Sequence, residues 1–379
     1  MDIYIDHIDG DHLKLDSICD KWFEVLWTRR FLKCDDFTIR LPPTAKNIEL
    51  FSEGKVIELA KINPLSGASE HAGIITAVTI TAGEKSTLTV SGQSFDGLLD
   101  RRILTMYAAG DTAMTVFRKN AGDLATAARR FDAITFDASN DIAASGGVRS
   151  MQFKTLADYA NYLATNKNWG LQSSIAHDSA VAPHIIISGR PRTDRSTLQS
   201  TEKCVIFSDD RGNATDFERK YSDSGAVTSV VVGSMVQHNE SKKIDVQEFI
   251  AFFDKDNAKG YDRIEKYQSI TPTTSTETRG ETEWSVLDYN ATWEAAALLA
   301  PSLYSPPTDC LDFVPALGVD WESKFLVGDI ITAENRAWGV SQSQQITEIQ
   351  EFWGADSTTV TATLGDPPKR LMEIIKQSR

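Results

Sequence analysis

Residues Phe51–Ile57 of this chain read FSEGKVI, and residues Phe325–Ile331 read FLVGDII. In the first repeat an Ile-Thr pair begins at Ile75, and the stretch GEKST then begins at Gly83. In the second repeat the Ile-Thr pair begins at Ile346, and the stretch GADST begins at Gly354. The spacing from the Ile-Thr pair to its glycine, and from that glycine to the following Ser-Thr, is the same in both repeats.

Each repeat consists of a strand, a loop, a second strand, a glycine turn and a third strand, which is typical of a small antiparallel β-barrel. Short hairpins draw on few residue types, so any single block could arise by convergence. Three blocks in the same order with matched spacing favour a duplicated β-domain, and a chain that carries one barrel twice suggests an assembly component more than an enzyme. We expect three pairs of residues to be equivalent: Gly54 and Gly328 in a turn with positive φ, Thr76 and Thr347 in the second strand, and Gly83 and Gly354 at the hairpin turn.

The composition is that of a globular protein with several domains. The chain has 379 residues, of which 41% are hydrophobic and 24% charged, and this length suits about two to four domains. Its formal net charge is −14, and its Lys and Arg pairs are scattered. Because nucleic-acid binding needs clustered basic residues, this charge argues against a protein that grips DNA or RNA.

The cysteines, the N-terminus and the hydropathy place further limits on the class of protein. The four cysteines are far apart and form no C-x-x-C pair, so we expect free thiols and neither a disulfide framework nor a zinc site. The first residues are acidic and alternate with apolar ones, unlike a secretory signal. No apolar run reaches the roughly 18 residues of a spanning helix, so we expect no membrane span.

Changes of pattern along the chain predict a β-rich α+β fold with several domains. We expect two related antiparallel β-barrels and two smaller α/β lobes, with the second barrel discontinuous. The expected boundaries are 1–105 for the first barrel, 106–201 for a mixed α/β lobe, 202–236 and 308–366 for the second barrel, 237–307 for an inserted lobe, and 367–379 for a C-terminal tail.

Three local signals are specific enough to predict single elements. Thr155 with Asp158 resembles a capping box, and the apolar spacing after it predicts a helix that ends near 166–170. A second helix is expected after Asn290 and should end at Pro301. The stretch Asp209–Asn213 (DDRGN) predicts a hairpin turn.

The motifs of catalysis and metal binding are incomplete. The stretch Asp254–Glu265 resembles a calcium loop, but Ala258 and Lys259 replace the oxygen ligand and the glycine at its fifth and sixth positions. The stretch Gly92–Asp96 lacks the final glycine of a nucleophile elbow. No phosphate-binding glycine motif occurs, and the histidines show no paired spacing: His7, His12, His71, His177, His184 and His238. We therefore predict no catalytic, cofactor-binding or metal-binding residues and no cofactor.

Several landmarks together carry a resemblance to a known family. They are Trp27–Phe31 with Phe37–Pro42, Gly73–Ile75 leading through Ser91-Gly92 to Leu98–Ile103, Val205–Ser208 with Gly212-Asn213, Phe325–Ile331, and Ile346–Ile349 with Leu364–Asp366. On these landmarks the chain resembles the tail-hub (baseplate-hub) proteins of long-tailed bacteriophages, including the N-terminal structural part of siphophage tail-associated proteins. The resemblance covers nearly the whole chain, although its motifs encode β-turns and no chemistry.

The resemblance implies tail-tube-like barrels and a structural protein that is not an enzyme. Three chains would place six similar barrels in a ring that joins a sixfold tail tube to a threefold tip. The implied partners are two further copies in a homotrimer, a tail-tube or distal tail protein, tip or fibre proteins, and DNA that passes through the lumen without specific binding. The implied location is the virion tail tip of a phage or prophage, assembled in the bacterial host cytoplasm. Because the chain ends at Arg379, soon after the second barrel, we expect no hydrolase domain after it.

Two alternatives stay open from the sequence. A carbohydrate-binding or cell-wall-degrading protein could use tryptophans as sugar platforms, although their spread over the whole chain fits core and interface positions better: Trp22, Trp27, Trp169, Trp284, Trp293, Trp321, Trp338 and Trp353. The spike-hub of a contractile secretion system shares the fold that the resemblance implies.

Overall fold

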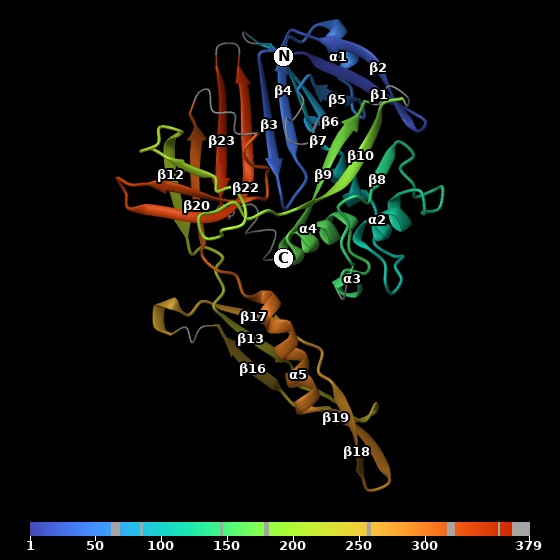
Figure 1. Ribbon diagram of the computed structural model, residues 1–379. Coiled ribbons are helices and arrows are strands. Elements are labelled where there is room, and N and C mark those ends of the chain that lie inside the picture. Colours follow the sequence, from blue (N-terminus) through green and yellow to red (C-terminus); the bar gives the residue numbers. More distant parts are fainter. Residues whose placement is uncertain are drawn as a thin grey trace. The chain divides into compact units, whose positions relative to one another are not determined.

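The computed structural model describes residues 1–61, 69–83, 86–144, 147–177, 182–255, 259–316, 323–354 and 357–365. The central residues of both predicted glycine turns lie outside the described residues, as do Trp321 and the C-terminal tail. The chain divides into two compact units (Figure 1). The first consists of Met1–Glu218 with Leu311–Gly365, and the second contains Arg219–Cys310.

A 13-stranded sheet dominates the first unit. Strands of the first repeat are β1 (Ile3–Asp9), β2 (His12–Cys19), β3 (Glu24–Arg30), β4 (Asp36–Leu41), β5 (Val56–Leu59), β6 (Ala72–Thr81) and β7 (Thr87–Ser94). Strands of the second repeat are β11 (Ile206–Ser208), β12 (Ala214–Ser222), β20 (Thr308–Pro315), β21 (Ile330–Asn335), β22 (Val340–Gly354) and β23 (Thr358–Leu364). The mostly β character that the sequence predicted is therefore confirmed.

Alternation of apolar and polar residues forms these strands, as the sequence indicated. In β4, the side chains of Phe37, Ile39 and Leu41 are buried, whereas Thr38 and Arg40 are not, which is the period of a half-buried strand. Each repeat has its own buried core. Phe51 lies in the first core and Phe325 in the second, and both are fully buried.

The strands of the two repeats follow the same order in the sheet. The first repeat reads β3-β4-β7-β6-β5-β1 and the second reads β12-β20-β23-β22-β21-β11. The registers agree as well, since Val56 faces Ile74 in the first repeat and the equivalent Ile330 faces Gln345 in the second. The repeats differ at one end, where β1 is antiparallel to β5 but β11 is parallel to β21.

The predicted equivalence of Thr76 and Thr347 is confirmed by a shared irregularity. In β6 the register against β7 shifts between Ile75 and Ala77, and in β22 the register against β23 shifts at the same place around Thr347. Each threonine is thus the extra residue of a β-bulge. Its hydroxyl lies 3.4 Å from the carbonyl oxygen of Ser91 in the first repeat and 3.5 Å from that of Thr363 in the second.

The predicted glycine turns before β5 and β21 are also confirmed. Gly54 has φ of 85° and Gly328 has φ of 102°, a left-handed conformation that glycine adopts without steric cost. The N–H of Gly54 donates to the carbonyl of Ile75 (3.0 Å), and the N–H of Gly328 donates to that of Ile346 (2.9 Å). Local sequence signals therefore identified two turns that are equivalent bond for bond.

Other expectations differ from the structure. Asp209–Asn213 is a turn but not a hairpin, because β11 before it pairs with β21 and β12 after it lies beside β20. Gly83 has φ of 155°, whereas Gly354 is still part of β22 and has no positive φ. The described strands of the two repeats form one continuous sheet, and no closed barrel is found among the described residues.

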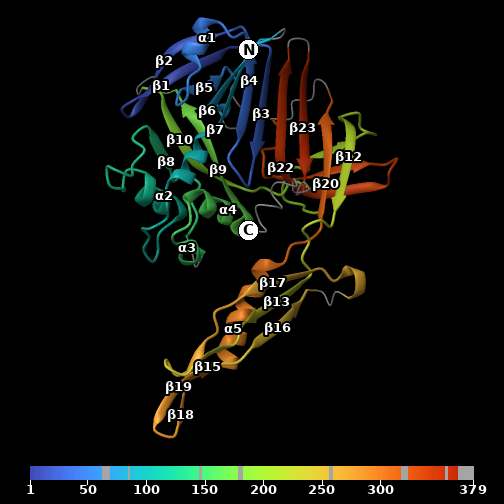
Figure 2. The ribbon, with the colours of Figure 1, turned by 180° about the vertical axis from the view of Figure 1, so that it is seen from behind.

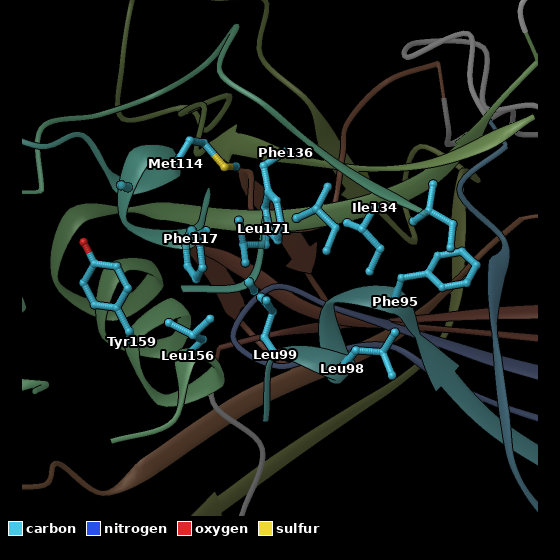
Figure 3. Close-up of a cluster of buried hydrophobic side chains, with 14 of the residues drawn as sticks. Phe95, Leu98, Leu99, Met114, Phe117, Ile134, Phe136, Leu156, Tyr159 and Leu171 are labelled. Atoms are coloured by element: carbon cyan, nitrogen blue, oxygen red, sulfur yellow. The ribbon is translucent and has the colours of Figure 1, made fainter. Parts of the chain in front are cut away.

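A mixed lobe follows the first repeat. It contains η1 (Phe95–Arg101), α2 (Ala113–Ala121), β8 (Ile134–Asp137), α3 (Gly147–Ser150), α4 (Leu156–Lys167), β9 (Trp169–Ala176) and β10 (His184–Pro191). The sheet order is β8-β10-β9, with β8 parallel to β10. The capping box is confirmed, since Thr155 and Asp158 exchange both bonds and α4 ends at Lys167. Apolar side chains of these helices and strands pack into one core (Figure 3).

The second unit carries two small sheets and one helix. Its elements are β13 (Ser229–Ser234), β14 (Gln237–Asn239), β15 (Ile244–Val246), β16 (Phe249–Asp254), η2 (Gly260–Asp262), β17 (Glu265–Ser269), β18 (Thr274–Arg279), β19 (Thr282–Leu287), α5 (Tyr289–Leu299) and η3 (Ala300–Leu303). The sheets run β16-β13-β17 and β14-β15-β19-β18. The predicted helix after Asn290 is α5; the chain then continues through Pro301 as a 3-10 turn. The remaining helix, α1 (Ala45–Leu50), precedes β5 in the first unit.

Candidate functional site

The most distinctive feature of the first unit is the junction between its two repeats, called here the seam. In the seam β22 of the second repeat pairs antiparallel with β3 of the first, from Glu348 opposite Arg30 to Gly354 opposite Glu24. Figures 1 and 2 show from both sides that the strands of the second repeat continue the sheet of the first. The seam joins two related sheets edge to edge, as two subunits joined by strand pairing would be.

A buried ionic cluster reinforces the seam. Glu351 of β22 stands opposite Trp27 of β3 and is fully buried. Its carboxylate contacts Nε2 of His71 and Nζ of Lys61, both from the first repeat, at 2.5 Å each. Burial alone raises the pKa of the Glu351 carboxyl, but the charges of His71, Lys61 and Arg29 outweigh it and hold that pKa well below its ordinary value. Glu351 is therefore an ion that only the paired seam accommodates.

Aromatic rings enclose this cluster. Trp27 and Trp353 each meet the His71 ring edge-on, at centroid distances of 5.6 and 5.7 Å. Lys61 Nζ lies 5.3 Å from the Trp353 ring centre, within the range of a cation–π contact. At the partly exposed end of the seam, Arg30 Nε donates to Glu348 at 2.9 Å. The seam thus combines strand hydrogen bonds, aromatic packing and charge.

A second group of buried charges lies beside the seam. Glu70 pairs with Arg29 of β3 and with Arg190 of β10, the latter at 3.2 Å. Near them, burial and then the charge of Asp96 raise the pKa of Asp35 to about 7. Burial likewise raises the pKa of Asp96. These side chains connect the first repeat with the mixed lobe, and their charges largely compensate one another.

The ring of Phe31 packs tightly at the end of the seam. This residue follows β3, and its ring is buried in the core of the second repeat. A Cβ atom at Gly328 would lie 2.1 Å from Cδ2 of the Phe31 ring, and a Cβ at Gly170 would lie 2.7 Å from Cε2. Both glycines therefore leave the space that the ring fills. At Gly54, the counterpart of Gly328, nothing lies within 4 Å of such a Cβ.

The incomplete catalytic motifs take structural roles where they are described. The Ser94 hydroxyl of the Gly92–Asp96 stretch is buried, bonds Asp96 and accepts from the N–H of Asp35 at 2.8 Å. In the calcium-like stretch, Asp254 and Glu265 both pair with Arg263 at 2.6 Å; residues 256–258 lie outside the described ones.

Most of the six histidines lie within ion-pair distance of a carboxylate. Five of them contact a carboxylate: His7 with Asp16, His12 with Asp11, His71 with Glu351, His177 with Glu58, and His238 with Asp245. Within the described ranges, no group of three or more His, Cys, Asp or Glu side chains could hold a metal ion. No helix in the described part of the chain is long and apolar enough to cross a bilayer.

The tryptophans divide between core and surface. Trp27 and Trp169 are fully buried, whereas Trp293 and Trp338 are exposed. Trp284 is surrounded by His238, Lys243 and Arg279, whose charged or aromatic groups lie 5.1–6.2 Å from its ring centre. The most buried of these rings therefore serve packing, as the sequence pattern favoured. The sequence carried no signal for the seam, which joins strands far apart along the chain.

Comparison with known proteins identifies relatives of this chain. Residues 2–366 match the family model described as Siphovirus ReqiPepy6 Gp37-like protein. No curated protein matches. A solved tail protein from Neisseria meningitidis MC58 is similar at 12% identity and a TM-score of 0.50, with 96% of each chain covered.

Two further solved structures are similar. The 43 kDa tail protein of prophage MuSo2 from Shewanella oneidensis has 11% identity and a TM-score of 0.50, with coverage of 96% of this chain and 98% of that one. Prophage tail protein gp18 from Listeria monocytogenes EGD-e has 10% identity and a TM-score of 0.44, with coverage of 100% and 98%. At these identities, the first two show a shared fold.

Proposed function

The chain belongs to the family of Siphovirus ReqiPepy6 Gp37-like proteins, and on that premise we propose that it is a structural tail-hub protein of a phage or prophage. In this proposal three chains form a ring at the tail tip, and the ring joins a sixfold tail tube to a threefold tip. Each repeat contributes a tail-tube-like β-domain to the ring. The domain boundaries predicted from the sequence, including the discontinuous second barrel, belong to the same proposal.

The seam is the observation that carries this proposal. It joins two repeats of equal strand order and register edge to edge within one chain. A ring of three such chains presents six similar sheets. A tail tube whose rings contain six subunits, each with one such repeat, would therefore meet a surface of matching symmetry. The two solved tail proteins that share the fold support the same assignment.

The chemistry of the described residues fits a structural role without catalysis. Arg29, Glu70 and Glu351 are buried at the seam and paired with other charged side chains or with His71, which suits a rigid junction better than a site that must admit substrate. With a net charge of −14, the lumen of the ring would repel DNA and let it pass, because like charges release no counterions. The proposed partners are therefore a tail-tube or distal tail protein, tip or fibre proteins, and DNA without specific binding.

The experiment that tests this proposal is the stoichiometry of the purified protein by native mass spectrometry and sedimentation over a range of concentrations. We expect a species of three copies whose fraction increases with protein concentration. A species of two or six copies would contradict the threefold ring. Turnover of bacterial cell wall or polysaccharide, lost on changing one acidic side chain, would contradict the structural role. Tight DNA binding that weakens with salt would contradict the proposed lumen.

A further inference from the structure

We propose that the outer half of β6, Thr76–Thr81, is the edge on which a second copy of this chain docks its strand β12, Ala214–Ser222. The inference rests on the ring proposed above and deepens it by naming the two strands that meet between copies. It is argued from the internal seam, which shows how this chain joins two such sheets.

The internal seam uses an edge that, in the first repeat, has no partner strand among the described residues. In the second repeat, β22 pairs with β21 along its first half, and with both β23 and β3 along its second half. In the first repeat, β6 pairs with β5 along its first half and with β7 along its length. No strand among the described residues takes the place beside Thr76–Thr81 that β3 takes beside β22.

The strand that corresponds to β3 is β12. β3 neighbours β4, and β12 neighbours β20. β4 and β20 are themselves equivalent, because Phe37 faces Gly92 in the first repeat and Leu311 faces Leu364 in the second. Since β12 ends the strand order, one of its edges has no partner strand among the described residues. Repeating the seam therefore brings β12 onto β6.

The open edge of β6 has the composition of a contact surface. Residues Thr76–Thr81 read TAVTIT, with high β-propensity, no charge and no proline. Natural proteins guard free edges with charges or prolines, because an unguarded edge recruits other strands. The bulge at Thr76 does not prevent pairing, since β22 has the same bulge at Thr347 and pairs with β3 beyond it. Ile80 is 53% exposed, whereas Glu351, which occupies the equivalent position in β22, is 0% exposed because β3 covers it. The strand that ends the sheet order on this side, β2, differs from β6, because it carries Lys14 and Asp16 and its Leu13 N–H donates to the carbonyl of Pro183 at 2.7 Å.

The edge of β12 differs in composition from the edge of β6. Its sequence contains Glu218, Arg219 and Lys220 together with Tyr221, which is 66% exposed. Asp216 has φ of 52°, so the strand is bent there. Phe217 stacks on Phe313 at 6.1 Å and anchors the strand to the core. A contact between unlike edges repeats head to tail and can close a ring.

The partner must be another copy. Within one chain, six strands separate β12 from β6 in the sheet order, namely β20, β23, β22, β3, β4 and β7. That path does not close on itself among the described residues. The two edges therefore serve two different junctions, one at each end of the pair of repeats.

A charged residue on the open edge tests the proposal. We expect Ile80→Lys to weaken self-association at least about tenfold, because a lysine on an edge opposes strand addition. Leu15→Lys on β2 is the matched control, since Leu15 is 52% exposed on the strand that ends the sheet order on the side of the first repeat, and it should leave association unchanged. Sedimentation gives the association constants, and circular dichroism of both variants shows that the fold is retained.

Cross-linking identifies the strand that meets β6. Benzoylphenylalanine at position 80 is activated by light in a mixture of isotope-labelled and unlabelled chains, so that cross-links between copies are recognised by mass. We expect cross-links to peptides from Ala214–Ser222 of the other copy. A multimer that cross-links elsewhere, or that Ile80→Lys and Leu15→Lys affect equally, overturns this inference and leaves the ring standing. A chain that stays monomeric at millimolar concentration overturns both.

Discussion

The duplicated turn offers a direct measurement of what Phe31 contributes to the seam. Gly54 and Gly328 occupy the same turn in the two repeats, and both have positive φ. Only Gly328 lies against the Phe31 ring, where an added Cβ would come within 2.1 Å of Cδ2; at Gly54 the same atom would meet nothing within 4 Å. Alanine at either position thus causes the same kind of backbone strain, and only one position adds a clash.

The expected losses of folding stability follow from the backbone strain and the steric clash. Left-handed backbone in a residue with a Cβ costs about 1–2 kcal/mol, so Gly54→Ala should destabilise the first unit by that amount. Gly328→Ala should add about 1–3 kcal/mol for overpacking of a filled core. The same edge of the Phe31 ring is packed against Gly170, so the ring has little room to move away.

Urea unfolding followed by tryptophan fluorescence measures both losses, because Trp27 and Trp169 are buried in the first unit. The shift of the midpoint multiplied by the slope gives the change in the free energy of unfolding. In a Phe31→Ala background, Gly328→Ala should lose its extra cost and match Gly54→Ala. Equal losses for the two single alanine variants in the natural background would refute the argument.

Three further predictions concern the buried charges and the caps. Glu351→Gln should cost about 3–5 kcal/mol because it removes the buried carboxylate that Lys61 and His71 contact in the seam. Glu348→Gln at the partly exposed end should cost about 1 kcal/mol or less; unfolding of both variants by urea checks this. Because the Glu351 pKa is lowered in the fold, the advantage of the natural chain over Glu351→Gln should be full above the unfolded carboxyl pKa and should shrink as the pH falls below it. Asp35 has its pKa raised to about 7, so its ionisation opposes folding as the pH rises from about 4 to 7. The difference in stability between Asp35→Asn and the natural chain should therefore favour the variant more at pH 8 than at pH 5. A difference that favours the variant more at pH 5 would contradict this. Thr155→Ala should cost about 1 kcal/mol through loss of the capping box, with Thr165→Ala near the other end of α4 as control in the same thermal unfolding assay.

The features predicted correctly from the sequence are those that a few neighbouring residues determine. The positive φ of Gly54 and Gly328 follows from a tight turn that only glycine enters easily, and the α4 cap follows from Thr155 and Asp158. The equivalence of Thr76 and Thr347 follows from the matched spacing to the next glycine. These features depend on residues that are close together in the sequence, so they can be predicted without knowing which distant segments come into contact.

The features that the sequence did not predict depend on partners far along the chain. The turn Asp209–Asn213 has the right residues for a hairpin, but turn chemistry does not say which strands pair, and β11 and β12 each pair elsewhere. The seam brings β3 against β22 without any local motif. Asp35 and Asp96 carry no local signal in the sequence, and only the tertiary fold brings them together and raises the pKa of each carboxyl.

Duplication inside one chain also explains why the two equivalent edges have diverged. Glu351 is stable in the seam because His71 and Lys61 of the first repeat compensate its charge. Position 80 is equivalent to Glu351, and the matched register makes Gln342 of the second repeat equivalent to His71. A glutamate at position 80 would therefore meet a second repeat that has glutamine in place of the imidazole. An apolar residue at that place needs no such partner, and Ile80 supplies one. Once the repeats are separate stretches of sequence, each edge can carry the residue that suits its own junction, which a ring of six identical subunits cannot do.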